Sequence, residues 1–439
     1  MAPTGPAPPL LVTDGLLVTQ DAQRRVLRGD IRVDGGCITQ VGGHASREGA
    51  EVIDGRRLAV VPGFVNTHTH IAMNLLRGIA DDRELAGFLE KLFRVDARRT
   101  EADVEAGARA GIAELLLGGT TSFLDLYYFE DAVARATEAL GVRGFLGWAV
   151  LDPDKTTQSG TPLENARGFI GRWKSHARVT PLVAPQGVYV CDRSTWLGAR
   201  ALAESERTLC HFHLAETRRE VHEHEAKTGR RPTEWLEEIG FFGPRMVAAH
   251  AVWLTGREIE ILGRRKVGIA HCPSSNLKLA SGGVAPVVEL RAAGAPVGLG
   301  TDSVASNNSL SMLREVHLAG LVQKNQRWDA TVLTAQELLD LATIEGARIV
   351  GKGDELGSLE VGKQADFSLV RLDHPTLLPA RPEAIISHLA YSASDEAIDS
   401  VYVAGEPLVR SRRLVRADWE EIRAAAEAAA APLWDASSG

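Results

Sequence analysis

Two histidines, His68 and His70, stand one residue apart in the stretch VPGFVNTHTHIAMNLLRG, which spans residues 61 to 78 and opens with strand-forming residues. Side chains alternate between the two faces of a strand, so these two imidazoles point the same way. Two imidazoles on one face can share a metal ion. The same pattern also fits two hydrogen-bonded core histidines or a surface pair, so the rest of the chain has to decide.

From residue 61 to about residue 350 the sequence predicts short apolar strands, each followed by a helical stretch. The expected strands are residues 60–66, 120–125, 143–150, 178–185, 207–213, 246–250, 266–271 and 296–301. Eight such units are the number that closes a parallel (β/α)8 barrel of the TIM type. One helical stretch, EADVEAGARAGIAELLLGG, carries an apolar stripe and ends in Gly118 and Gly119, as a helix C-terminus does.

Both ends of the chain have a different character. Residues 10–60 and 353–408 are rich in strand and turn signals, and DWEEIRAAAEAAAA is expected as a helix that ends at Pro432. We therefore expect an α/β fold with a catalytic barrel over residues 61–352. Residues 1–60 plus 353–439 are expected to form a small discontinuous β-sandwich domain beside the barrel.

Polar residues stand where several expected strands end. They are His68 and His70 after the first strand, His213, His250 and His271 at the ends of the fifth to seventh strands, and Asp302 after the eighth. Barrel active sites lie at this carboxyl-terminal rim. A lone histidine at a strand end is usually a core residue, but packing does not explain so many on one rim.

The sequence therefore predicts a metal site with His68, His70, His213 and Asp302 as ligands. Three imidazoles and a carboxylate suit one Zn²⁺ per subunit, or Fe²⁺, and leave a position for water. His211 competes for a ligand role, but it lies one layer deeper than the rim and is expected in the core.

Three residues at this rim are candidate catalytic groups. A metal lowers the pKa of water towards neutrality, and Asp302 would take the proton from that water. Glu216, three residues past His213, would carry a proton to a ring nitrogen, and His250 would orient the hydroxide. Attack on an amino-bearing aromatic carbon would then release ammonia.

Composition limits the other classes of function. The formal charge of −8 and pI near 5.9 give no electrostatic footprint for nucleic acid, so a small-molecule substrate is expected. The start MAPTGPAPPL lacks the features of a signal peptide, and no apolar run approaches a membrane-spanning length. Four cysteines are scattered without a CxxC pair, so no thiolate zinc site is indicated. We expect a cytoplasmic homo-oligomer without membrane contact.

Several motifs together resemble the amidohydrolase superfamily, most closely its S-adenosylhomocysteine and 5'-methylthioadenosine deaminase branch. They are PGFVNTHTH, HLAET, HCPSSNLKLASG, GLGTDSVASNN and GSLEVGKQADF. The resemblance implies a metal-dependent barrel hydrolase with a composite β-sandwich, which deaminates an adenosine-type nucleoside with the residues named above. The fourth strand ends in LVAPQG without a lysine, so the carbamylated lysine of two-metal relatives is absent and a mononuclear site is expected.

Departures from the family pattern concern the substrate. Gln186 replaces a substrate-contacting histidine, and Asp96 is the candidate for a ribose-binding glutamate of the family. Trp148 and the GTPLENAR stretch stand where arginines would hold the homocysteine carboxylate, and an unpaired carboxylate in a pocket is costly. This disfavours S-adenosylhomocysteine relative to methylthioadenosine or adenosine. His271 fits either a substrate contact or a core hydrogen bond.

Two other functions stay open: a triazine-type chlorohydrolase or aminohydrolase on another ring, and a non-catalytic scaffold barrel. Two further motifs are interpreted as structural. GSLEVGKQ has the spacing of a phosphate loop, but Gln364 stands where a Mg²⁺-binding hydroxyl belongs, so it predicts a turn that enters a strand. HEHE, with His222 and His224, lies in a charged segment and is expected as solvated surface.

Overall fold

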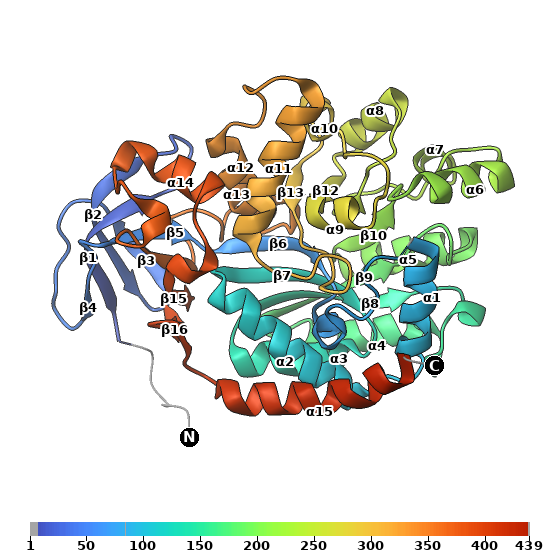
Figure 1. Ribbon diagram of the computed structural model, residues 1–439, viewed down its shortest axis with the longest axis horizontal. Helices are drawn as coiled ribbons and strands as arrows, with labels where there is room; N and C mark the ends of the chain where they lie inside the picture. The colour runs from blue at the N-terminus through green and yellow to red at the C-terminus, as the bar shows by residue number, and fades with distance from the viewer. Residues whose placement is uncertain (1–7, 84, 438–439) are drawn as a thin grey trace.

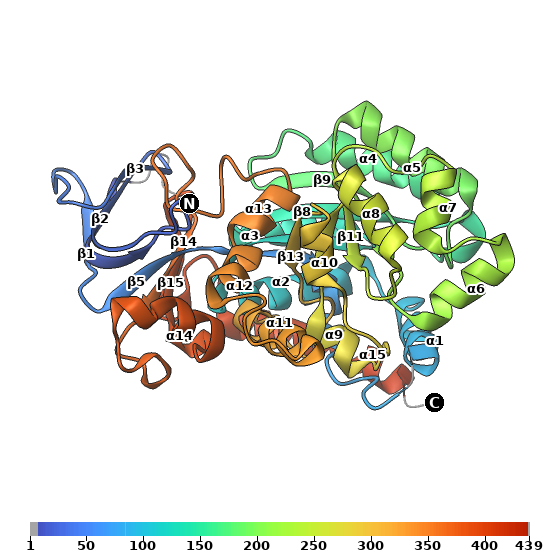
Figure 2. The same ribbon diagram turned by 90° about the horizontal axis from the view of Figure 1, so that it is seen from above.

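The computed structural model describes residues 8–83 and 85–437, which form two sheets, one of them surrounded by helices (Figures 1 and 2). In this part of the chain, eight parallel strands make up one sheet in the order β13-β12-β11-β10-β9-β8-β7-β6. They are β6 (Phe64–Thr69), β7 (Thr120–Tyr127), β8 (Arg143–Val150), β9 (Val179–Pro185), β10 (Cys210–Leu214), β11 (Met246–His250), β12 (Gly268–His271) and β13 (Val297–Leu299). The predicted (β/α)8 barrel is confirmed.

The barrel closes between its first and last strands, β6 and β13. Thr67 Oγ1 donates to the carbonyl oxygen of Leu299 at 2.8 Å, and the backbone N–H of Asp302 donates to the carbonyl oxygen of His68 at 3.0 Å. Gly300 permits this approach, because a Cβ atom there would lie 2.9 Å from the backbone nitrogen of His68. The closure therefore places Asp302 beside the end of β6.

Helices cover the outside of the barrel and link its strands (Figure 2). Those between β6 and β11 are α1 (Leu85–Asp96), α2 (Glu101–Leu117), α3 (Glu130–Leu140), α4 (Pro162–Trp173), α5 (Arg193–Glu206), α6 (Arg218–Thr228) and α7 (Pro232–Glu238). The later ones are α8 (Gly256–Arg265), α9 (Pro273–Lys278), α10 (Val287–Ala292), α11 (Met312–Arg327), α12 (Ala335–Ala342), α13 (Ile344–Ile349), α14 (Ile385–Tyr391) and α15 (Trp419–Ser437). A 3-10 helix, η1 (Ile71–Leu76), follows β6 directly.

The ends of α2 show how local sequence sets these helices. Thr100 caps its first turn, and its hydroxyl accepts from the backbone N–H of Asp103 while the Asp103 carboxylate accepts from the N–H of Thr100. This reciprocal capping box satisfies two N–H groups that would otherwise be orphaned. Gly118 caps the C-terminus and Gly119 follows at φ +84°, as the sequence predicted.

Apolar side chains fill the barrel interior, so the barrel is a packed core. Val65, Leu124, Leu182 and Val247, from four different strands, belong to one buried cluster. The same cluster includes Ile349 of α13, and this helix covers the amino-terminal end of the barrel. Polar residues replace the apolar ones at the carboxyl-terminal end, where the active sites of such barrels lie.

The two chain ends build a second, mixed sheet beside the barrel (Figure 1). Its strands are β1 (Leu10–Val18), β2 (Val26–Asp34), β3 (Cys37–Val41), β4 (Glu51–Asp54), β5 (Leu58–Pro62), β14 (Phe367–Arg371), β15 (Ile398–Val403), β16 (Glu406–Arg410) and β17 (Arg413–Leu414). Ile38 of β3 and Tyr402 of β15 share one buried cluster with Phe367, so the sheet folds over on itself as a sandwich does. Residues 357–364 form turns before β14, as predicted for GSLEVGKQ.

The domain limits expected from the sequence stay a prediction. Two helix or strand boundaries expected from the sequence are wrong. The first expected strand, 60–66, spans the end of β5 and the start of β6, which Gly63 separates. The helix expected to end at Pro432 continues to Ser437. A proline removes one backbone donor, and here buried Leu433 and the Trp434 indole, which donates to the carbonyl oxygen of Leu75 at 2.9 Å, hold the last turn in place.

Among the described residues, no helix combines the length and apolar character that a membrane span requires.

We expect Gly107→Ala in α2 to lower the melting temperature, although alanine is the better helix former. A Cβ atom at Gly107 would lie 2.2 Å from the carbonyl oxygen of Ala72 in η1, and such overpacking costs about 1 to 3 kcal/mol. Gly171→Ala in α4 is the matched control, because no atom lies within 4 Å of its added Cβ and about 0.5 to 1 kcal/mol of stabilisation is expected. Thermal unfolding measures both, and equal shifts would contradict the close packing of η1 on α2.

Candidate metal centre and active site

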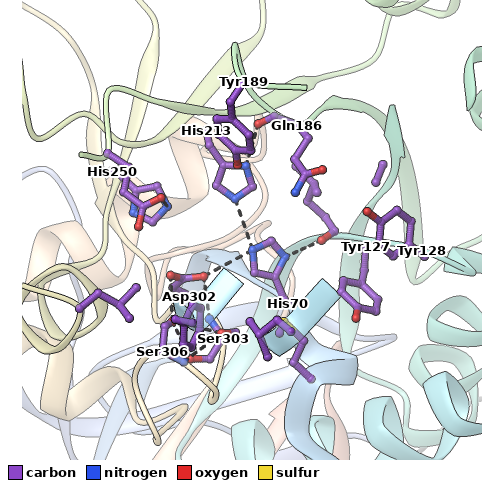
Figure 3. A pocket seen from close by; sticks show the side chains of 17 residues that line it. His70, Tyr127, Tyr128, Gln186, Tyr189, His213, His250, Asp302, Ser303 and Ser306 are labelled. Carbon is purple, nitrogen blue, oxygen red and sulfur yellow. Dashed lines mark hydrogen bonds and ion pairs between the residues drawn. The ribbon is translucent and has the colours of Figure 1, made fainter. Parts of the chain in front are cut away.

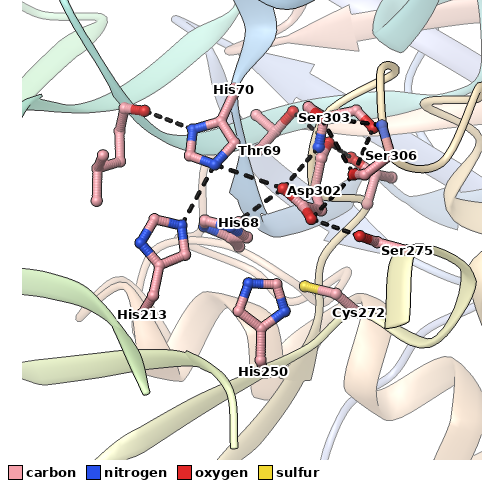
Figure 4. A network of polar contacts seen from close by, with 12 residues as sticks. His68, Thr69, His70, His213, His250, Cys272, Ser275, Asp302, Ser303 and Ser306 are labelled. Carbon is pink, nitrogen blue, oxygen red and sulfur yellow. Dashed lines mark hydrogen bonds and ion pairs between the residues drawn. The ribbon is translucent and has the colours of Figure 1, made fainter. Parts of the chain in front are cut away.

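The side chains of three histidines and one aspartate converge at the carboxyl-terminal end of the barrel (Figure 4). His68 and His70 come from the end of β6, His213 from β10, and Asp302 from the segment after β13. His70 Nε2 lies 3.3 Å from His213 Nε2 and 3.4 Å from Asp302 Oδ1, and His68 Nε2 lies 3.5 Å from the same oxygen. The structure thus brings together the four residues that the sequence predicted as ligands.

These separations fit a tetrahedral ion. Metal bonds of about 2.1 Å place tetrahedral donors about 3.4 Å apart, close to the three separations above. His68 Nε2 is buried without a hydrogen-bond partner among the described residues, as a ligand atom would be. The donor set, with imidazole nitrogen and carboxylate oxygen, is also the one that zinc takes in catalytic sites. The residues present therefore fit a divalent metal.

The other nitrogen of each imidazole is held from behind. His70 Nδ1 lies 2.5 Å from the carbonyl oxygen of Leu126, and His213 Nδ1 lies 2.7 Å from that of Gln186. A carbonyl oxygen can only accept, so both imidazoles carry their proton on Nδ1 and turn a lone pair on Nε2 towards the centre. Burial lowers the pKa of His68 to about 4 and that of His213 well below its usual value, which keeps these two rings neutral.

Asp302 is held as a carboxylate by a separate set of donors. Burial acts to raise its pKa, but contact with His68 and the nearby imidazoles holds that pKa well below its usual range. Ser275 and Ser306 donate their hydroxyls to Oδ2 at 2.5 and 3.0 Å, and the backbone N–H of Ser303 donates to Oδ1 at 2.7 Å. The backbone of Asp302 is left-handed, with φ +57°, a strained conformation of the kind that gathers at functional sites.

His250 and Glu216 lie beside this cluster, and the His250 ring centroid is 5.3 Å from that of His68 and 5.4 Å from that of His213. His250 ends β11 with φ +74°, which turns its ring into the cavity, and its Nε2 lies 3.8 Å from Glu216 Oε2. Burial and the negative charge of Asp302 raise the pKa of Glu216 to about 8. Glu216 is therefore protonated at neutral pH, while Asp302 is ionised.

A neighbouring carboxylate, Glu220 of α6, holds the loop that presents Glu216. It accepts the backbone N–H groups of Ala215 at 3.1 Å and Glu216 at 2.8 Å. Burial and the proximity of Glu216 raise its pKa to about 7. Ala215 has φ +48°, so this contact stabilises a strained turn directly after β10.

The cavity is mostly apolar on the side away from the histidines (Figure 3). Its apolar and aromatic lining residues are Met73, Phe88, Leu92, Leu126, Tyr127, Tyr128, Ala149, Tyr189 and Leu279, and its polar ones are His70, Gln186, His213, Glu216, His250, Asp302, Ser303 and Ser306. Among the described lining residues none is arginine or lysine. Gln186 reaches the cavity, and its Oε1 has no hydrogen-bond partner in the described part of the chain.

Comparison with known proteins agrees with this geometry. A model of the amidohydrolase family matches residues 59–408. The chain belongs to the amidohydrolase family. Over 368 residues it is 40% identical to the 5-methylthioadenosine/S-adenosylhomocysteine deaminase of Thermodesulfovibrio yellowstonii, and the match covers 83% of each chain. The resemblance inferred from the sequence motifs is therefore confirmed.

Two solved structures share the whole fold of this amidohydrolase. One is an adenosine deaminase from Xanthomonas campestris with bound zinc, which is 32% identical, has a TM-score of 0.92, and matches 97% of this chain and 98% of its own. The other is the atrazine chlorohydrolase of Arthrobacter aurescens TC1 complexed with zinc, which is 28% identical, has a TM-score of 0.88, and matches 96% of this chain and 100% of its own.

Other predicted contact residues of the amidohydrolase lie elsewhere. Trp148 faces away from the cavity, because alternation along β8 gives the inner face to Ala149 and sends the indole towards Phe169 of α4 at 6.2 Å between ring centroids. Asp96 ends α1, and its side chain lies outside the described part of the structure. His271 is buried and does not line the cavity, and neither ring nitrogen has a hydrogen-bond partner among the described residues.

The interpretation of HEHE as solvated surface is wrong for one of its two histidines. In HEHE, His222 is exposed as expected, but His224 is only 7% exposed and packs edge-on against Trp235 of α7. Because α6 is hydrophilic throughout, its sequence does not indicate which of its faces packs against α7.

Sequence reasoning also missed the hydroxyls that hold Asp302. Ser275 and Ser306 stand in the motifs HCPSSNLKLASG and GLGTDSVASNN, so the signal was present. Which serine of each motif faces the aspartate depends on the turn of α9 and of the segment after β13, which the sequence does not specify.

We expect Glu216→Gln to raise the melting temperature of the metal-free protein. The folded-state pKa near 8 lies above the ordinary value of 4.5, so the wild-type protein loses stability as pH rises between these values, and the glutamine variant does not. The gain should be larger near pH 8.5 than near pH 5. Exposed Glu223→Gln on α6, the helix that follows Glu216, is the control and should change the melting temperature equally at pH 5 and pH 8.5. No pH dependence of the gain for Glu216→Gln would contradict the buried, protonated state of Glu216.

Proposed function

We propose that this amidohydrolase is a metal-dependent hydrolytic deaminase that acts on an adenosine-type nucleoside. The observation that carries the proposal is the convergence of three imidazoles and a carboxylate on one point, with His250 and Glu216 beside them at the same cavity. The related deaminase at 40% identity supports the reaction type. The barrel over residues 61–352 would carry the chemistry, with the composite sheet as its support.

In this proposal His68, His70, His213 and Asp302 hold one divalent metal. Zinc is the proposed ion, because both solved relatives described above are reported with zinc. Fe²⁺ suits the same donors and is the alternative that elemental analysis of the purified protein would reveal. When bound, the ion lowers the pKa of water and so supplies hydroxide at neutral pH.

The protein groups move the protons of the reaction. Asp302, held as a carboxylate, accepts a proton from the attacking water at Oδ1, the oxygen that faces the histidines. Glu216, protonated at neutral pH, donates its proton to the ring nitrogen beside the amino-bearing carbon. His250, at the end of β11, orients the attacking oxygen with its imidazole ring. The amino group then leaves as ammonia with the proton that Asp302 accepted. The oxygen from water loses its second proton, which returns to Glu216, and becomes the carbonyl oxygen of the ring, while the ring nitrogen keeps the proton that Glu216 donated.

The cavity favours an uncharged substituent on the sugar. The apolar wall of Met73, Phe88 and Leu92 matches a methylthio or methyl group. A homocysteine tail would bring a carboxylate into a cavity whose described lining residues include no cation, and an unpaired buried charge is costly. We therefore propose methylthioadenosine, deoxyadenosine or adenosine as substrates ahead of S-adenosylhomocysteine, with Gln186 as a contact to the substrate.

Hydrolytic removal of chloride from a triazine ring is the second candidate reaction, because one solved relative is an atrazine chlorohydrolase. A non-catalytic barrel is a third, and the complete ligand set argues against it.

We also propose that the protein forms homo-oligomers. Leu321 of α11 and Trp328, which caps the C-terminus of this helix, are 46% and 96% exposed and offer apolar surface for self-association. Cytoplasmic location and the absence of nucleic-acid binding stay predictions.

A substrate panel tests the proposed function directly. We expect the zinc-loaded protein to release ammonia from 5'-methylthioadenosine, 5'-deoxyadenosine or adenosine, and to do so much more slowly from S-adenosylhomocysteine. An amino-chlorotriazine completes the panel, with chloride followed in parallel. Release of chloride without ammonia would select the chlorohydrolase, and turnover of S-adenosylhomocysteine as fast as methylthioadenosine would refute the proposed selectivity.

Glu216→Gln tests the proposed acid. The amide cannot donate a proton as a carboxylic acid does, so kcat should fall by about 10²- to 10⁴-fold while zinc content stays at the wild-type level. Glu223→Gln, which changes an exposed glutamate of α6, is expected to keep wild-type kcat. Full activity of Glu216→Gln would show that another group supplies the proton.

A further inference from the structure

Behind the metal centre, three residues form a buried hydrogen-bonded chain that crosses the barrel. The chain runs from the carbonyl oxygen of Val247 in β11 to His211 Nδ1 at 3.0 Å, and from His211 Nε2 to His68 Nδ1 at 2.8 Å. Both imidazoles have no exposed surface. His68 then presents Nε2 to the centre, where it has no hydrogen-bond partner among the described residues.

The carbonyl oxygen of Val247 determines which ring nitrogen is protonated in both His211 and His68. Because the oxygen of Val247 can only accept, His211 carries its proton on Nδ1. A neutral His211 then has a lone pair on Nε2, which accepts the Nδ1 proton of His68. His68 Nε2 is left unprotonated, which is the state that binds a metal.

The arrangement differs from that of the two other histidines. His70 and His213 reach backbone carbonyls directly, at 2.5 and 2.7 Å. His68 is held by a side chain, so this one ligand depends on a residue that a mutation can change. It also occupies the deepest position of the site, where solvent cannot replace a lost acceptor.

We propose that His211 is a positioning residue that fixes the tautomer and ring orientation of His68 and thereby sets the affinity of the metal centre. The proposal rests on the metal site proposed above. It gives a specific role to the histidine that competes with His213 in the motif CHFHLAET and that sequence analysis assigned to the core.

Three substitutions separate the acceptor from the other contributions of His211. In His211→Gln the amide oxygen lies near the place of Nε2 and can accept from His68. In His211→Asn the shorter side chain reaches only the carbonyl oxygen of Val247, and His211→Phe keeps the ring volume without either contact. We expect the zinc Kd, measured by competition with a chelator, to rise about 10- to 100-fold in the Asn and Phe variants and to stay near the wild-type value in the Gln variant.

The control removes a buried imidazole elsewhere. His224→Gln changes the ring packed on Trp235 and should leave the zinc Kd unchanged. A purely structural role of His211 would lower the melting temperature in all three variants without ranking their zinc affinities. A further measurement needs no variant. In wild-type protein whose histidines carry ¹⁵N, NMR should find both His68 and His211 protonated on Nδ1.

The outcomes distinguish this inference from the proposed function. Tight zinc binding by the wild-type protein with equal affinities in the Gln and Asn variants would overturn the role of His211 and leave the metal site intact. A proton on Nε2 of His211 or His68 would do the same. If the wild-type protein bound no divalent metal, the proposed metal site would fail and the role of His211 with it.

Discussion

The site depends on one constraint: buried imidazoles must stay neutral with their Nε2 lone pairs turned to a common point. Water cannot solvate their protons at this depth, so each ring needs an acceptor on its far side. Backbone carbonyls of Leu126 and Gln186 serve two rings, and His211 with the carbonyl of Val247 serves the third. Strands β7 and β11 and the residue directly after β9 supply these carbonyls, so the ligand geometry follows from the sheet.

The closure of the barrel adds the negative charge that these rings cannot provide. Asp302 stands beside His68 only because the chain after β13 runs within hydrogen-bond distance of β6, and Gly300 leaves room for that approach. The left-handed backbone of Asp302 and the hydroxyls of Ser275 and Ser306 then aim one carboxylate oxygen at the histidines. If β13 paired with β6 in a different register, the Asp302 carboxylate would leave the site while the three imidazoles stayed in place.

Much of this architecture could be predicted from the sequence, because strand ends and site residues coincide in a barrel. The strands at 143–150 and 246–250 have the bounds that periodicity and turn signals indicated, and the four ligand candidates meet. The orientation of a side chain is harder to predict. Trp148 and Ala149 are neighbours in β8, and only the register of the sheet determines that the small residue faces the cavity. His224 is similar, since a polar helix gives no sign of which of its faces meets α7.

The same cavity shifts two carboxyl groups in opposite directions, and this difference gives the site both a base and an acid. Asp302 accepts from two serine hydroxyls and a backbone N–H, so it stays ionised although it is buried. Glu216 faces apolar surface and the charge of Asp302, so it holds its proton near neutral pH. The ionised Asp302 is thus part of what keeps Glu216 protonated. A reaction that takes a proton from water and gives one to a ring nitrogen needs this pairing, and the fold produces it by placing one carboxyl among donors and the other at an apolar wall.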